Sequence, residues 1–144
     1  IEMFLGEYSH TIDEKGRLTI PAKFRADLAD GLVITRGIDR CLAIYPMAEW
    51  QALADRVGAL PITDRNARAF RRLVFAAASH AVPDSQGRVL IPPRLREYAQ
   101  LDSEAVVTGL DRFIEVWRPG LWDQERDHVE GESVDVEGWA ILGI

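Results

Sequence analysis

The sequence predicts an α+β fold rich in β-structure, built as one module from two copies of the same unit. The chain has 144 residues, of which 47% are hydrophobic and 28% charged, enough for one domain with a sizeable core. A pattern of short alternating segments, turn residues and proline occurs twice along it. Each copy has only about 50 ordered residues, near the lower limit for an independent core, so we expect the copies to intertwine about a pseudo-twofold axis.

The internal repeat is clearest at two turns. Residues 13–25 match residues 84–96 without a gap at an offset of 71, with aspartate, glycine, arginine, isoleucine and proline identical. After a one-residue insertion the match resumes at an offset of 72, where residues 37–40 match residues 109–112. Two matches of this length in one chain indicate a duplicated unit rather than chance.

Each copy is predicted to begin with a β-hairpin. In the first copy, residues 8–12 and 17–20 alternate in polarity and flank a turn that starts at an aspartate and contains a glycine. The aspartate accepts hydrogen bonds from backbone N–H groups of the turn, and the glycine tolerates a positive φ. The four residues expected to shape the two loops are Asp13, Gly16, Asp84 and Gly87.

The remaining elements follow from proline and apolar spacing. Proline suits the first turn of a helix, so helices are predicted over residues 22–28 and 93–101 and again from Pro46 and Pro119. Strands are predicted over residues 32–35, 41–45, 105–108 and 113–117, and Tyr45, Trp50 and Trp122 are expected in the core. A helix capped by Thr63 or Asp64 connects the copies and runs to about residue 76.

These elements divide the chain into four parts. We expect a first copy over residues 3–60, a connecting helix over 61–76, a second copy over 77–122 and an acidic C-terminal helix and tail over 123–144. Little regular structure is expected from Gly131 to Gly138, where turn and acidic residues dominate. The first two residues precede Met3, an expected start residue, and are left out of the fold prediction.

Charge is distributed unevenly. The formal net charge is −6, but residues 1–101 hold 14 basic and 12 acidic residues while residues 102–144 hold 3 and 11. Three segments, 15–25, 65–72 and 85–96, contain several basic residues and no acidic one. Local basic clusters in an acidic protein leave a nucleic-acid partner open.

Several function classes are disfavoured. Cys41 is the only cysteine and the three histidines are scattered, so we expect neither a metal site nor a cofactor and infer a reducing compartment. No segment approaches the roughly 20 apolar residues of a membrane span, and no basic leader precedes the first strand. We therefore expect a cytoplasmic protein without a membrane partner.

The start Met3-Phe4-Leu5-Gly6-Glu7-Tyr8 and the two Asp-x-x-x-Arg signatures, each followed by Ile-Pro, resemble the bacterial MraZ transcriptional regulators over about residues 3–122. The resemblance implies a pseudo-twofold, double swapped-hairpin β-barrel of the AbrB (SpoVT-AbrB) type with short peripheral helices. It also implies a ring-shaped homo-oligomer, octamer-like or larger. The expected partner is double-stranded DNA, with short G-rich direct repeats in the promoter of the division and cell-wall gene cluster, bound by a nucleoid-associated regulator of its own operon.

Chemistry and resemblance together indicate the DNA-contacting residues. Lysine and arginine neutralise phosphates, and arginine pairs with the O6 and N7 atoms of guanine. The alternative is that Arg17 and Arg88 only form ion pairs with Asp13 and Asp84. The arginines of residues 65–72 could add phosphate contacts, or they could simply form the solvent-exposed face of a helix. The candidates are Lys15, Arg17, Lys23, Arg25, Arg88, Arg94 and Arg96.

Two other functions use the same repeat. An aspartic hydrolase places two repeat-related aspartates on one axis, but its carboxylates are adjacent and followed by Ser/Thr-Gly, whereas Asp13 precedes Glu14 and Asp84 precedes Ser85. A ring-forming scaffold or adaptor would use the oligomer without DNA. We expect no enzyme.

Overall fold

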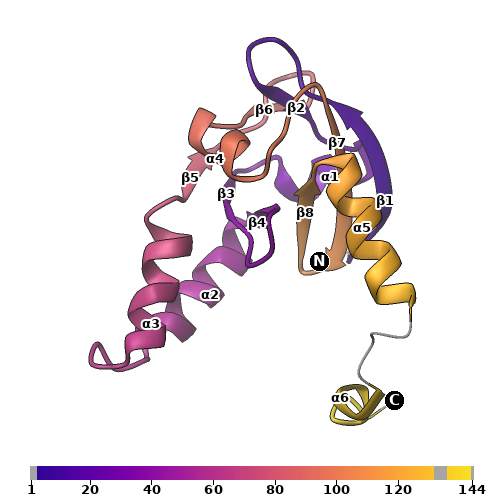
Figure 1. Cartoon of the computed structure of the whole chain (residues 1–144). Coiled ribbons are helices and arrows are strands. Elements are labelled where there is room, and N and C mark those ends of the chain that lie inside the picture. The colour runs from indigo at the N-terminus through magenta and orange to yellow at the C-terminus, as the bar shows by residue number, and fades with distance from the viewer. Residues whose placement is uncertain (1–2, 132–135, 144) are drawn as a thin grey trace.

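The computed structural model describes residues 3–131 and 136–143 (Figure 1). It is an α+β fold rich in antiparallel β-structure, which confirms the predicted class. A six-stranded sheet contains β1 (Phe4–Thr11), β3 (Leu32–Arg36), β4 (Leu42–Pro46), β5 (Ser79–Ala81), β7 (Glu104–Asp111) and β8 (Phe113–Trp117). The strands β2 (Arg17–Thr19) and β6 (Arg88–Leu90) pair with each other in a separate ribbon.

Strand order in the large sheet reflects the duplication. The order is β1-β7-β8-β4-β3-β5, so exchanging each strand for its counterpart in the other copy reproduces the same order from the opposite end. The first strand of each copy pairs with a strand of the other copy, β1 with β7 and β5 with β3. Among the described residues no ladder joins the edge strands β1 and β5, so the sheet stays open and does not close into the expected barrel.

The predicted local hairpin forms only at its turn. Its two arms are joined by a single bridge, between Ile12 and Leu18. The second arm, β2, instead pairs along its length with β6, which places Leu18 opposite Val89. Both side chains are buried, 0% and 2% exposed, because the ribbon directs them into the core shared by the two copies. This burial outweighs the local pairing that strand alternation alone predicts.

Helices form at the predicted places, and one further helix lies near the C-terminal end of the described residues. They are α1 (Ala22–Leu28), α2 (Met47–Gly58), α4 (Pro93–Tyr98), α5 (Pro119–Glu130) and α6 (Val136–Ala140). The helix α4 ends before residue 101, since Gln100 adopts a positive φ of 56°. The α6 helix contradicts the irregular structure expected through Gly138, and residues 132–135 of that stretch lie outside the described residues.

The connecting segment is helical, as predicted, in two parts. The helix α3 (Arg65–Phe70) continues into a π-helical turn, η1 (Arg71–Phe75). The Asp64 carboxylate caps α3 by accepting hydrogen bonds from the backbone N–H groups of Asn66, at 2.8 Å, and Ala67, at 3.2 Å. This confirms Asp64 rather than Thr63 as the cap.

The main core takes residues from both copies. Its buried members include Leu18 and Val89 from the ribbon and Ile20 and Ile91 directly after its strands, together with apolar residues of the sheet. Tyr45, Trp50 and Trp122 are half-buried rather than central. The rings of Tyr45 and Trp50 pack together with centroids 5.8 Å apart, and the Trp122 ring packs near Trp117 at 5.7 Å. None of the described helices is long and apolar enough to cross a membrane.

Candidate functional site

The loop of the first copy is organised by Asp13. Its Oδ1 atom accepts hydrogen bonds from the backbone N–H groups of Lys15, at 3.0 Å, and Arg17, at 2.9 Å. Its Oδ2 atom accepts a third, from the Arg17 Nε atom at 2.7 Å. Gly16 closes the turn with a φ of 82° and a hydrogen bond from its N–H to the Asp13 carbonyl.

The loop of the second copy repeats this pattern. The Asp84 carboxylate accepts from the backbone N–H groups of Gln86 and Arg88 and from the Arg88 Nε atom, each at 2.9 Å. Gly87 has a φ of 75°. In both loops an aspartate carboxylate thus accepts from the following backbone N–H groups, and both arginines form the ion pair that the sequence left as an alternative.

Both aspartates are held in the ionised form. The N–H donors of Arg17 lower the pKa of Asp13, and those of Arg88 lower the pKa of Asp84. A catalytic pair of aspartates shares one proton, which requires one raised pKa. The loops thus lack the protonation that an aspartic hydrolase needs.

The two loops are joined across the pseudo-twofold axis. The backbone N–H of Ile20 donates to the carbonyl of Gly87 at 2.8 Å, and that of Ile91 donates to Gly16 at 2.9 Å. With the β2–β6 ladder, these bonds hold both turns at one end of the molecule, above the sheet in Figure 1. The two loops of distant segments therefore lie at the same end of the molecule.

The predicted site residues fall into two groups by exposure. Lys15, Lys23 and Arg94 are exposed. The residues that are half-buried are Arg17, Arg25, Arg88 and Arg96. The Nε atoms of the two helix arginines donate to backbone carbonyls, Arg25 to Ile20 at 2.9 Å and Arg96 to Ile91 at 3.0 Å.

The arginines of the connecting segment are not simply a solvated face. Arg71 donates to the carbonyl of Val57 in the last turn of α2, at 3.0 Å, and to that of Leu60 just past the helix, at 3.1 Å. Arg68 donates to the carbonyl of Ile62 at 3.0 Å. These two side chains stabilise the link between α2 and α3.

Sequence reasoning missed Arg36. It ends β3, directly before the repeated glycine at position 37, and the corresponding residue of the second copy is Thr108. The sequence signal that could have identified Arg36 is that a long cationic side chain in one copy matches the short hydroxyl side chain of Thr108 in the other. The structure brings Arg36 to the wall of a cavity that Arg94 also lines.

Comparison with known proteins gives consistent matches. A family model described as "MraZ protein, putative antitoxin-like" matches residues 3–73 and again residues 74–135. A relative named "Transcriptional regulator MraZ" from Herpetosiphon aurantiacus is 57% identical over 131 residues, 91% of this chain and 92% of the relative. Relatives of the same name from Thermomicrobium roseum and Desulfitobacterium hafniense strain Y51 are 50% and 46% identical, covering 93% and 99% of this chain and 94% and 100% of the relatives.

Proposed function

The chain belongs to the MraZ family, a family of transcriptional regulators and not of enzymes, and on this basis we propose that it binds specific DNA sequences through its two basic loops. The observation that carries the proposal is the β2–β6 ribbon, because it fixes the loops of both copies side by side. A two-stranded β-element fits the major groove, where arginine reads guanine.

The proposed contacts divide by chemistry. Arg17 and Arg88 read base edges, since the carboxylates of Asp13 and Asp84 engage only their Nε atoms in hydrogen bonds and so orient the guanidinium groups. Lys15, Lys23 and Arg94 neutralise phosphates, as exposed cations do. Arg25 and Arg96 support the loops and add positive charge behind them.

Family membership supports finer proposals. We propose that the target is a set of short G-rich direct repeats in the promoter of the division and cell-wall gene cluster, that the regulator acts on its own operon, and that it is a cytoplasmic, nucleoid-associated protein. Self-association into a ring, octamer-like or larger, would present several ribbons to successive repeats. We also propose the AbrB-type double swapped-hairpin arrangement and the division into residues 3–60, 61–76, 77–122 and 123–144.

The experiment is a fluorescence anisotropy titration of the full chain. One labelled duplex carries the sequence upstream of the protein's own coding region, and a second carries the same bases in scrambled order. We expect tighter binding to the upstream duplex and a steep loss of affinity between about 50 mM and about 200 mM salt. Equal affinity for both duplexes would refute sequence-specific binding, and absence of binding to either would favour the scaffold alternative.

A further inference from the structure

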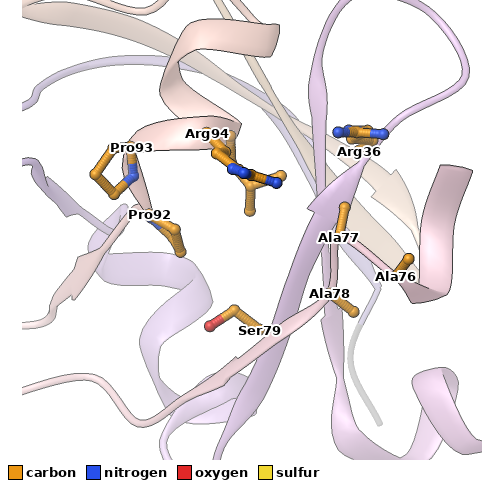
Figure 2. A pocket seen from close by; sticks show the side chains of 9 residues that line it. Arg36, Ala76, Ala77, Ala78, Ser79, Pro92, Pro93 and Arg94 are labelled. Carbon is orange, nitrogen blue, oxygen red and sulfur yellow. The ribbon is translucent and has the colours of Figure 1, made fainter.

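A cavity of about 490 Å³ lies between α4 and the segment that leads into β5. Alanines 76–78 form one wall and Pro92 and Pro93 another. Figure 2 shows Arg94 reaching from α4 across the cavity toward Arg36, which closes its upper end. The volume falls in the range of about 300 to 1,000 Å³ that is typical of small-molecule sites.

The two arginines lack anionic partners. Among the described residues neither Arg36 nor Arg94 forms an ion pair, and no acidic residue lines the cavity. The Arg36 Nε atom is buried without a hydrogen-bond partner, while its guanidinium lies 5.3 Å from the centre of the Tyr98 ring. A buried donor without an acceptor is costly, and an oxyanion would supply the missing acceptor.

At the place in the first copy that matches this cavity, aromatic side chains pack against each other. Tyr8 lies opposite Val107 in the sheet, and the counterpart of Val107 in the repeat is Thr35. Since Ser79 lies opposite Ile34, the preceding residue, Ala78, takes the place of Tyr8.

The packing differs accordingly. The Tyr8 ring packs edge-on against Phe24 with centroids 5.4 Å apart, whereas the second copy has Ala78 and Leu95 at these positions. At the cavity, smaller side chains of the second copy therefore lie beside an extra cation of the first copy, Arg36, where the matching place has Thr108. The smaller side chains and the additional positive charge therefore occur at the same cavity.

We propose that this cavity binds a small organic anion, a carboxylate or phosphate group on a compact apolar body. The oxyanion accepts hydrogen bonds from Arg36 and Arg94, and the apolar part lies against the alanine and proline walls. The occupant is a small molecule with an apolar part, because alanine and proline side chains form the cavity walls.

The test is isothermal titration calorimetry of the full chain with phenyl phosphate, with inorganic phosphate and benzyl alcohol as separate probes of charge and ring. We expect saturable binding of one phenyl phosphate per chain and weaker binding of both probes. Arg94→Gln should lower the affinity by about tenfold or more, the value of one charged hydrogen bond. Arg94 is exposed, so this variant should keep the fold.

Two further variants test whether binding needs the open cavity and whether it depends only on nearby positive charge. Ala78→Tyr introduces the aromatic residue of the first copy and should block the cavity while both arginines remain. Arg40→Gln is the matched control, because Arg40 also lies on the Tyr98 ring, at 4.7 Å, but does not line this cavity. It should change the affinity by less than about twofold.

Four results would overturn the proposal. The first two are the absence of saturable phenyl phosphate binding and a loss of affinity in Arg40→Gln equal to that in Arg94→Gln. The third is inorganic phosphate binding as tight as that of phenyl phosphate and unchanged in Ala78→Tyr, and the fourth is a changed oligomeric mass of Arg94→Gln when the parent protein binds no ligand. The last result would assign the surface to contacts between copies. A loss of DNA affinity in Arg94→Gln does not bear on the calorimetry and is measured separately.

Discussion

Arg25 of the first copy lies directly over Gly87 of the second, so a Cβ atom added at Gly87 would lie 2.7 Å from the Arg25 Cδ atom and 2.8 Å from its Cζ atom. The mirrored contact places Arg96 over Gly16. Each loop is therefore shaped by its own aspartate and covered by a helix arginine of the other copy. Neither loop is complete without both copies.

Gly87→Ala should destabilise the protein. Its φ of 75° strains any L-side chain, by about 1 to 2 kcal/mol, and the new Cβ would displace Arg25 from its hydrogen bond to Ile20. Urea unfolding measures the change. Gly58→Ala is the control, because Gly58 lies at the end of α2 with nothing within 4 Å of an added Cβ, and should be neutral or stabilising. Equal stability of the two variants would contradict the contact.

The loops should weaken in acid. Because the pKa of Asp13 and of Asp84 is lowered in the folded state, the unfolded chain binds more protons near pH 4 and stability falls as pH drops through the folded pKa values. The urea concentration at the unfolding midpoint should decrease as the pH is lowered from about 5 to about 3. The decrease should be smaller in the double variant Asp13→Asn, Asp84→Asn. Glu14→Gln, in the same loop, should leave the slope of the parent protein. A double variant with the parent's slope would assign the acid sensitivity elsewhere.

In DNA binding, substitutions of Arg17 and Lys15 in the first loop should have different effects. Arg17→Lys keeps the charge but loses the planar fork, so the preference for the upstream duplex should drop by about 1 to 3 kcal/mol. Lys15→Ala should instead weaken binding to both duplexes and reduce the salt slope by about one phosphate contact. Arg112→Ala, an exposed arginine paired with Glu49, serves as the control. The same loss of preference in Arg17→Lys and Lys15→Ala would refute the division of roles.

The acidic C-terminal segment should limit non-specific binding. The expected tail begins at residue 123, inside the continuous helix α5, whose Trp122 Nε1 atom donates to Glu7 of β1 at 2.5 Å. Beyond residue 122 the same helix places Arg126 3.8 Å from the Glu7 carboxylate. The useful truncation is therefore after Gly131, which removes three acidic residues and no basic one.

If the segment competes with phosphates, this deletion should raise affinity for scrambled DNA more than for the upstream duplex, most strongly at low salt. Anisotropy titrations over a salt series measure both affinities. Unchanged affinity for scrambled DNA at low salt would eliminate the competition. Weaker self-association of the shortened chain would indicate instead that Trp139 and its apolar neighbours contact another copy.

Cys41 should be inert in the folded protein. It is 0% exposed, and burial together with the Glu115 carboxylate, 3.5 Å from its Sγ atom, raises the pKa of the thiol. Its reaction with a thiol reagent at pH 8 should be slow in buffer and rapid in urea, with the rate set by unfolding. Fast labelling of the folded chain would contradict this burial.

Much of the candidate site could be predicted from the sequence because its interactions are local. The turns at Asp13 and Asp84 close within five residues, through a carboxylate that bonds the next N–H groups and a glycine that accepts a positive φ. Likewise the start of α3 follows from the Asp64 cap. Such short-range hydrogen bonds depend on spacing alone.

The sequence by itself determined the duplication, the two loops and the α+β class, whereas the tertiary structure decided which strands pair. Alternation of polar and apolar residues predicts a strand but not its partner. Burial in the shared core determines that β2 pairs with β6 and β1 with β7. The sheet register also reveals that Ser9-His10 corresponds to Ser79-His80, a shift from the offset of 71 at the turns that exposes the exchange of Tyr8 for Ala78. Register depends on which faces of two distant strands are buried together, and that is settled only when both copies fold as one.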